Sequence, residues 1–156
     1  MQQDQQLMQQ ALSLAERAFE LGEAPIGAVI ADESGQVIAA AYNEREAKQS
    51  PIAHAEIIAI EKAAMVLQSW RLESCTIYVT LEPCLMCAGA IMQARLNRIV
   101  YGAYADKTGA LSSVVNVYEH RFGYSPKVRG GVLEGECAAL LNRFGEENLR
   151  GGSSRL

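Results

Sequence analysis

The chain has 156 residues, about the length of one domain. Hydrophobic residues make up 49% and charged residues 21%, so the chain can bury a core and is neither disordered nor fibrous. The formal net charge of -4 differs from the basic balance that is typical of dedicated nucleic-acid binders.

The first half of the chain predicts a helix, a β-hairpin and a second helix. Apolar residues recur at helical spacing over residues 7–20, and Gly22 ends this predicted helix. The runs APIGAVIAD and QVIAAAY are typical of paired strands, with their connection at Asp32–Gly35. Residues 44–50 form a predicted charged loop, and a helix rich in Ala and Ile follows from His54 to Leu67.

The second half alternates strands with helices. Thr76–Thr80 is a short predicted strand, and Pro83 opens a helix over CLMCAGAIMQAR because proline fits the first turn of a helix. Arg98–Ala103 is another predicted strand, and Glu136–Phe144 predicts a short C-terminal helix. The alternation favours an α/β fold, a three-layer α/β/α sandwich with helices on both faces of one mixed sheet.

The organisation of the chain favours one compact unit in the cytoplasm. No linker rich in Pro, Gly or Ser interrupts residues 1–145, so we expect a single domain over residues 1–156, with about 146–156 as a flexible tail. No apolar run reaches the roughly 18 residues of a membrane span. The polar start lacks a signal-peptide pattern, so we expect a cytoplasmic protein that is not bound to a membrane. In that reducing compartment the four cysteines favour metal binding or burial over disulfides.

The pattern with the most specific chemistry is HAE at His54–Glu56 together with PCLMC at Pro83–Cys87. Cys84 and Cys87 form a C-x-x-C pair, a recurrent zinc chelate, and His54 supplies a third ligand. Three protein ligands leave one tetrahedral position for water, which distinguishes a catalytic zinc site from a closed structural one. We therefore expect one Zn²⁺ per subunit, since two thiolates and an imidazole favour zinc over other divalent ions.

Both halves of this pattern lie at predicted helix N-termini. Residues two apart in mid-helix point about 200° apart, but at a helix start His54 and Glu56 can both reach a target beyond the end of the axis. The free N–H groups and positive dipole of a helix start lower thiol pKa values and favour the thiolates that zinc needs. Zinc lowers the pKa of its water to about 7. We expect Glu56 to take that proton and deliver it to a leaving amine.

Other interpretations of the same residues remain open. Cys84 and Cys87 also fit a redox pair of the thioredoxin type, although the HAE segment then has no role. Glu56 also fits a solvated carboxylate at a helix start.

HAE followed by PCLMC matches the known H-x-E…P-C-x-x-C signature of zinc-dependent nucleoside and nucleobase deaminases. Longer segments resemble one branch, the bacterial tRNA adenosine deaminases, over roughly residues 5–145. These segments are APIGAVI, YNERE, PIAHAEIIAI, WRLESCTIYVTLEPCLMCAGAI, RIVYGAYADKTGA and GVLEGECAALL. The resemblance implies a cytidine deaminase-like fold with a central mixed five-stranded sheet.

The resemblance also implies a function and its partners. It implies a homodimer that converts adenosine to inosine at the wobble position of a tRNA anticodon stem-loop, with Glu56 as the catalytic residue. The positions that match the family's substrate contacts are Asn43, the backbone N–H of Ala55, and Ile26 and Leu81 in the base pocket.

The chain differs from this branch where the family usually has Asp or Asn for an RNA contact, because Ala105 stands there and Asp106 follows. An aminohydrolase of a free nucleobase or nucleoside, such as guanine or cytosine, is therefore the alternative. A non-catalytic zinc-binding subunit is a third interpretation, against which the presence of Glu56 argues. The cations available for phosphate contacts are Arg45, Lys48, Arg71, Lys107, Arg121 and Lys127.

Overall fold

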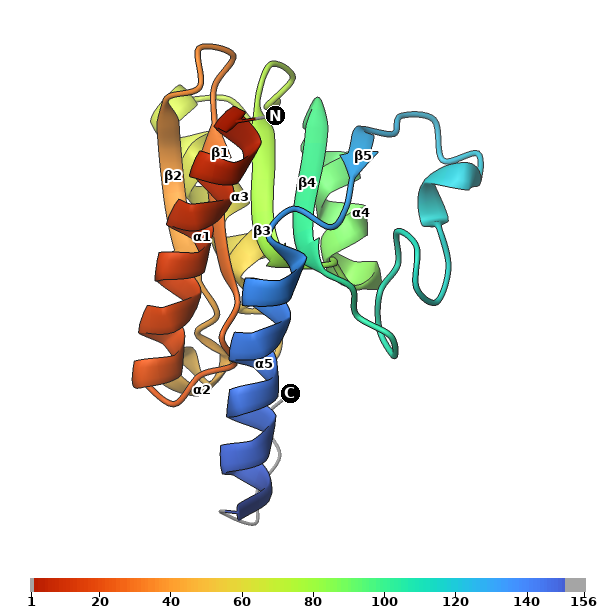
Figure 1. Ribbon diagram of the computed structural model, residues 1–156. Coiled ribbons are helices and arrows are strands. Elements are labelled where there is room, and N and C mark those ends of the chain that lie inside the picture. Colours follow the sequence, from red (N-terminus) through yellow and green to blue (C-terminus); the bar gives the residue numbers. More distant parts are fainter. Residues whose placement is uncertain (1, 151–156) are drawn as a thin grey trace.

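The computed structural model describes residues 2–150, and within them five strands form one mixed sheet of order β2-β1-β3-β4-β5 (Figure 1). β1 is antiparallel to both of its neighbours, whereas β3, β4 and β5 run parallel. In chain order the elements are α1 (Gln2–Glu20), β1 (Gly27–Ala31), β2 (Val37–Tyr42), α2 (Arg45–Lys48), α3 (Ala55–Leu67), β3 (Thr76–Leu81), α4 (Leu85–Gln93), β4 (Arg98–Ala103), a 3-10 turn (Val117–Glu119), β5 (Lys127–Arg129) and α5 (Glu134–Arg150).

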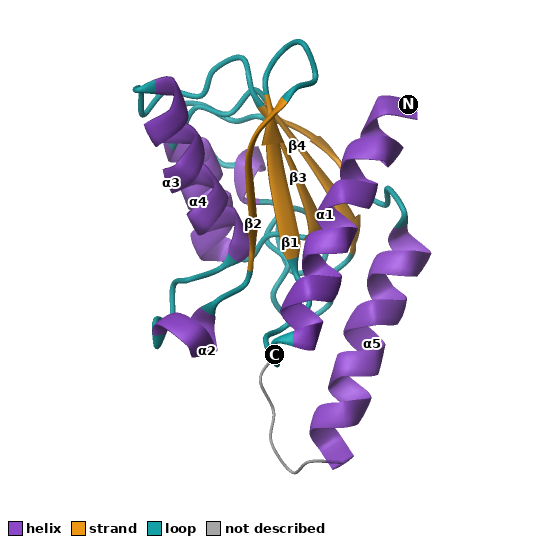
Figure 2. Cartoon of the chain, turned by 90° about the vertical axis from the view of Figure 1, so that its left-hand side faces the viewer, coloured by secondary structure: helices purple, strands orange, loops and turns teal. Residues whose placement is uncertain are grey.

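The helices cover both faces of the sheet, which confirms the predicted three-layer sandwich. α3 and α4 lie on one face, and α1 and α5 lie on the other (Figure 2). Successive strand residues alternate between the two cores, so Ile77 joins the core under α3 and α4 while Tyr78 joins the core under α1 and α5. None of the described helices combines the length and apolar character needed to cross a bilayer.

The predicted hairpin is confirmed. β1 pairs antiparallel with β2, and the Asp32 carboxylate closes the turn by accepting hydrogen bonds from the N–H groups of Ser34 (2.9 Å) and Gln36 (3.0 Å). Gly35 in this turn has φ of 88°, a backbone conformation that favours glycine. The hairpin brings the start of β1 beside the end of β2, and both of these ends lie at the edge where the candidate site is found.

Two elements, one helix and one strand, were not expected from the sequence. The expected charged loop at 44–50 contains the short helix α2, because the buried carboxylate of Glu23 accepts hydrogen bonds from the N–H groups of Glu46 (2.9 Å) and Ala47 (2.7 Å). The fifth strand, β5, is only three residues long, and none of its residues is buried. Its sequence therefore lacks the apolar pattern by which strands are recognised.

Helix α5 is longer than the expected Glu136–Phe144 and includes residues 146–150, which the sequence predicted to begin a flexible tail. Residues 151–156 lie outside the described part of the chain. The extension is stabilised by Phe144, which is buried and packs edge-to-face on Phe19 of α1 with 5.8 Å between ring centroids. This packing offsets the cost of Gly145 in a helix interior, about 1 kcal/mol.

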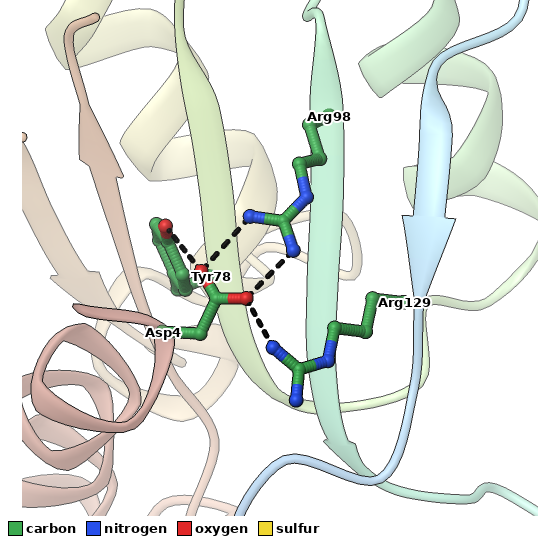
Figure 3. Close-up of polar contacts among 4 residues, drawn as sticks. All are labelled: Asp4, Tyr78, Arg98 and Arg129. Carbon is green, nitrogen blue, oxygen red and sulfur yellow. Dashed lines mark hydrogen bonds and ion pairs between the residues drawn. The ribbon is translucent and has the colours of Figure 1, made fainter. Parts of the chain in front are cut away.

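A buried carboxylate holds the start of α1 to three strands (Figure 3). Asp4 is 3% exposed and accepts hydrogen bonds from Arg98 at 2.9 and 2.6 Å, from Arg129 at 2.5 Å and from the hydroxyl of Tyr78 at 2.9 Å. Chiefly through the hydrogen bonds from Arg98, the pKa of Asp4 is held well below its usual range. Burial, with the contact to Asp4, raises the pKa of Tyr78 to about 12. We call these four residues the Asp4 clamp.

Candidate metal centre and active site

Two helix starts bring three potential metal ligands together. His54 is the N-cap of α3, Cys84 is the N-cap of α4, and Cys87 lies in the first turns of α4. Nδ1 of His54 lies 3.7 Å from Sγ of Cys84 and 3.5 Å from Sγ of Cys87. The three ligand atoms all lie within 4.8 Å of one another. The structure therefore brings together the three residues that the sequence predicts as ligands.

The local backbone explains why these side chains converge. His54 and Cys84 both have extended backbone, and their carbonyl groups accept the first helical hydrogen bonds, from Ile58 (3.1 Å) and Ala88 (2.8 Å). Neither side chain caps its own helix, although N-cap side chains commonly do so. Both side chains contact each other instead, at the edge of the sheet where β3 ends.

The spacing of the three atoms fits a tetrahedral metal ion. Zinc bonds of about 2.3 Å to sulfur and about 2.0 Å to nitrogen place sulfur and nitrogen roughly 3.6 Å apart in a tetrahedral centre. The observed Nδ1–Sγ separations of 3.7 and 3.5 Å agree with this value. Within residues 2–150, this cluster has three members, His54, Cys84 and Cys87, one fewer than the four protein ligands of a closed structural zinc site.

The two thiols and the imidazole strongly affect one another's protonation. Contact with the Cys87 thiol lowers the pKa of Cys84 to about 4, and the same contact raises the pKa of Cys87. The hydrogen bond to Cys84 raises the pKa of His54. Both cysteines would bind a metal ion as thiolates, so metal binding would release protons from this cluster.

Glu56 lies beside the ligand cluster without belonging to it. It is in the first turn of α3, two residues after His54, and it is 4% exposed. Burial raises the pKa of its carboxyl, and smaller effects from its own N–H, His54 and Cys87 oppose that rise. A carboxyl beside the cluster has the chemistry of a general acid–base group, and Glu56 is not a member of the cluster itself.

The predicted substrate contacts lie at the same edge of the sheet. Asn43, which is 3% exposed, directly follows β2, and its N–H donates to the carbonyl of Ile26 at 3.0 Å. The next N–H, of Glu44, donates to the carbonyl of Ala53 at 3.0 Å, one residue before His54. Ala55 is fully buried and is the first residue of α3. Ile26, Asn43 and Ala55 are thus joined to the metal ligands through the backbone.

Leu81 occupies a different environment from Ile26. It ends β3 at the same edge, but its side chain packs against the core under α1 and α5. Ile26 packs against the core under α3 and α4, the face from which the metal ligands come.

A second buried carboxylate at this edge was not anticipated from the sequence. Glu82 is 2% exposed and directly precedes Pro83 and Cys84. Burial favours a raised pKa, but hydrogen bonds from residues 105–113, in the loop after β4, outweigh it and lower the pKa of the Glu82 carboxyl. One signal in the sequence could have revealed it: a lone acidic residue that follows an apolar strand directly before the Pro-Cys pair.

Comparisons with known proteins agree with this geometry. The family described as the cytidine and deoxycytidylate deaminase zinc-binding region matches residues 1–103. A tRNA-specific adenosine deaminase of Bacillus subtilis is 46% identical over 148 residues, which cover 94% of this chain and 91% of the relative. A solved structure from a study of A-to-I editing by tRNA:A34 deaminases has a TM-score of 0.84 and 42% identity, covering 87% of this chain and 99% of its own. A guanine deaminase from Nitrosomonas europaea has a TM-score of 0.74 and 25% identity, covering 90% and 83%.

Proposed function

The chain belongs to the cytidine and deoxycytidylate deaminase family, and we propose that it is a zinc-dependent hydrolase that converts adenosine to inosine at the wobble position of a tRNA. The observation that carries the proposal is the His54, Cys84 and Cys87 cluster with Glu56 beside it. That arrangement supplies a hydrolytic centre, and the relatives named as tRNA adenosine deaminases supply the substrate class.

The reaction replaces the 6-amino group of adenine with oxygen from water and releases ammonia. Zinc, when bound by His54, Cys84 and Cys87, supplies a Lewis acid that makes water nucleophilic near neutral pH. Glu56 accepts the proton of the attacking water on its buried carboxylate and delivers it to the departing amine. The carboxylate thus begins and ends the cycle in the same state of protonation.

The same edge offers groups that hold the base. The N–H of Ala55, the first of α3, has no acceptor within the helix, and in this proposal it donates to a polar base edge. The amide side chain of Asn43 supplies both a donor and an acceptor. Ile26 supplies an apolar wall, whereas Leu81 borders the site only through its place at the end of β3, because its side chain packs against the core under α1 and α5. A base that is turned out of the RNA stack can enter such a pocket.

A homodimer in the cytoplasm completes the proposal. The outer face of α4 is apolar, with Leu85 67% exposed and with Gly89, at which an added Cβ would meet nothing within 4 Å. Exposed apolar surface of this kind favours a protein partner, and we propose a second copy of this chain. We expect a dimer in sedimentation, and we expect Ala90→Arg on the same face to give a monomer; a wild-type monomer contradicts this part of the proposal.

The substrate is tested by a direct comparison. Purified zinc-loaded protein is incubated at one stated salt concentration with an anticodon stem-loop RNA that carries a wobble adenosine and, separately, with free adenine, guanine, cytosine and their nucleosides. We expect inosine in the RNA and no ammonia from the small molecules. Ammonia from guanine or another free base, with unchanged RNA, overturns the tRNA assignment in favour of a nucleobase deaminase.

A further inference from the structure

The loop after β4 is held against the metal edge by one carboxylate. Oε1 of Glu82 accepts a hydrogen bond from the N–H of Ala105 (3.1 Å). Oε2 accepts three from the N–H groups of Leu111 (3.1 Å), Ser112 (2.7 Å) and Ser113 (2.9 Å). The hydroxyl of Ser113 donates to Oε1. Both ends of the loop are therefore attached to the same side chain.

The loop packs so closely on Glu82 that a side chain between them is excluded. A Cβ at Gly109 would collide with the Glu82 carboxyl group. The N–H of Ala110 donates to the carbonyl of Pro83 at 2.9 Å, one residue before the metal ligand Cys84. The short segment 82–84 thus both holds the loop and carries the metal ligand Cys84.

The tip of the loop points its polar side chains to solvent. Asp106, Lys107 and Thr108 are exposed and lie between the two attached ends, and Tyr104, just before the first attachment, is 41% exposed. The Tyr104 ring packs edge-to-face on Tyr101 with 5.3 Å between centroids, which limits its motion. An ammonium group and an aromatic ring are the groups that proteins use for phosphate contacts and for stacking on unpaired bases.

We propose that Glu82 is a positioning residue for the RNA substrate: its carboxylate fixes the 104–113 loop beside the metal centre and presents Lys107 and Tyr104 to the nucleotides that flank the target adenosine. The proposal deepens the proposed function and rests on it. Ala105 is only 8% exposed, and its N–H donates to Glu82, so Ala105 faces the protein. In this proposal the exposed residues near it, Tyr104 and Lys107, make the RNA contact.

The main test is Glu82→Gln, which keeps the shape of the side chain but removes its charge and replaces one acceptor oxygen with a donor. Both proteins are compared as zinc-loaded Glu56→Gln variants, so that the RNA stays unreacted. We expect the Kd for a fluorescent anticodon stem-loop to rise about tenfold, since hydrogen bonds to a charged group are lost. Zinc content should stay at one ion per chain, and hydrogen exchange should speed up at Ala105 and at 111–113.

A double-mutant cycle shows whether Glu82 affects RNA binding by positioning the loop tip or by a general loss of protein stability. If Glu82 acts through the loop tip, Glu82→Gln should have little further effect on the Kd once Lys107→Ala is present. Asp4→Asn, which destabilises the far end of the sheet, serves as the control and should leave the Kd unchanged. Ser113→Ala removes one donor and should give a smaller rise in Kd if Glu82→Gln fails to fold.

The outcomes distinguish this inference from the proposed function. An unchanged Kd for Glu82→Gln, or loss of zinc in parallel with loss of RNA binding, overturns the positioning role. Additive effects of Glu82→Gln and Lys107→Ala also overturn it. Failure of the parent protein to bind the stem-loop overturns the tRNA assignment itself, while the hydrogen-exchange measurement still shows whether Glu82 fixes the loop.

Discussion

Nδ1 of His54 and Sγ of Cys87 lie 3.5 Å apart although 33 positions separate the two residues in the chain. The contact exists because α3 and α4 lie on the same face of the sheet and both begin at the edge of the sheet where β3 ends. Strand β3 lies between these helices in sequence and sets their relative position. The metal centre therefore depends on the sheet as well as on the two helix starts.

Replacing Cys87 should remove the metal. Cys87→Ala leaves one thiol and one imidazole, too few protein ligands for a stable zinc site. We expect elemental analysis to find little zinc in this variant and assays to find no deamination. Cys75→Ala is the matched control, because Cys75 is equally buried but lies outside the cluster. Stoichiometric zinc in Cys87→Ala refutes its role as a ligand.

Replacing Glu56 should separate metal binding from catalysis. Glu56→Gln preserves the size of the side chain, but an amide cannot accept the proton of water. We therefore expect kcat to fall by about 10²-fold to 10⁴-fold. Zinc content should not change, because Glu56 is not a member of the ligand cluster. Glu61→Gln, an exposed site on the same helix, should keep full activity. Near-normal turnover in Glu56→Gln contradicts the proton-transfer role.

The Asp4 clamp should make stability depend on pH in the acid range. The pKa of Asp4 is lower in the folded chain than its ordinary value of 3.8, so its stabilising contribution is complete above that value and is lost as pH falls toward the folded pKa. Asp4→Asn should lower the free energy of unfolding by about 2–3 kcal/mol at pH 7, below the full cost of breaking a buried pair because the two arginines remain partly solvated.

Urea unfolding at several pH values checks this prediction. The difference between wild type and Asp4→Asn should shrink as the pH is lowered from 5 toward 3, and Glu16→Gln, an exposed site on the same helix, should show no such trend. A difference that stays constant over this range means that the clamp does not titrate as described.

Gly27→Ala should destabilise the packing of α1 on β1. An added Cβ would collide with the carbonyl oxygen of Ala11 and would lie 2.7 Å from the backbone nitrogen of Ala15. Because these are backbone atoms of a helix, relief requires a shift of α1, and we expect a loss of about 1–3 kcal/mol. Gly135→Ala, where nothing lies within 4 Å, should be neutral or stabilising by up to about 1 kcal/mol. Thermal unfolding that ranks the two variants in the opposite order contradicts this account.

The sequence predicted those parts of the fold that follow from local patterns. The bounds of Arg98–Ala103 agree with β4, and the HAE and PCLMC segments were correctly placed at helix starts. These successes share a cause, since hydrophobic periodicity and helix-start signals act over a few residues. The ligand cluster followed because its chemistry restricts the residue types and spacing that can form it.

The parts that were missed depend on contacts between distant residues. Helix α2 is held by Glu23, more than 20 positions earlier, and the extension of α5 is held by the packing of Phe144 on Phe19. The role of Glu82 depends on N–H groups 23 to 31 positions later. No local sequence pattern reveals these contacts, because a glutamate or a phenylalanine fits at many positions of a chain and does not by itself indicate its distant partner.

The Asp4 clamp and the catalytic edge lie at opposite ends of the parallel strands, since Arg98 is the first residue of β4 and the metal ligands follow the end of β3. Substitutions in the loops near the metal ligands therefore do not contact the Asp4 clamp, which holds α1 to the sheet. A change in the residues that contact the substrate at one end of the sheet therefore need not loosen the packing of α1 at the other end.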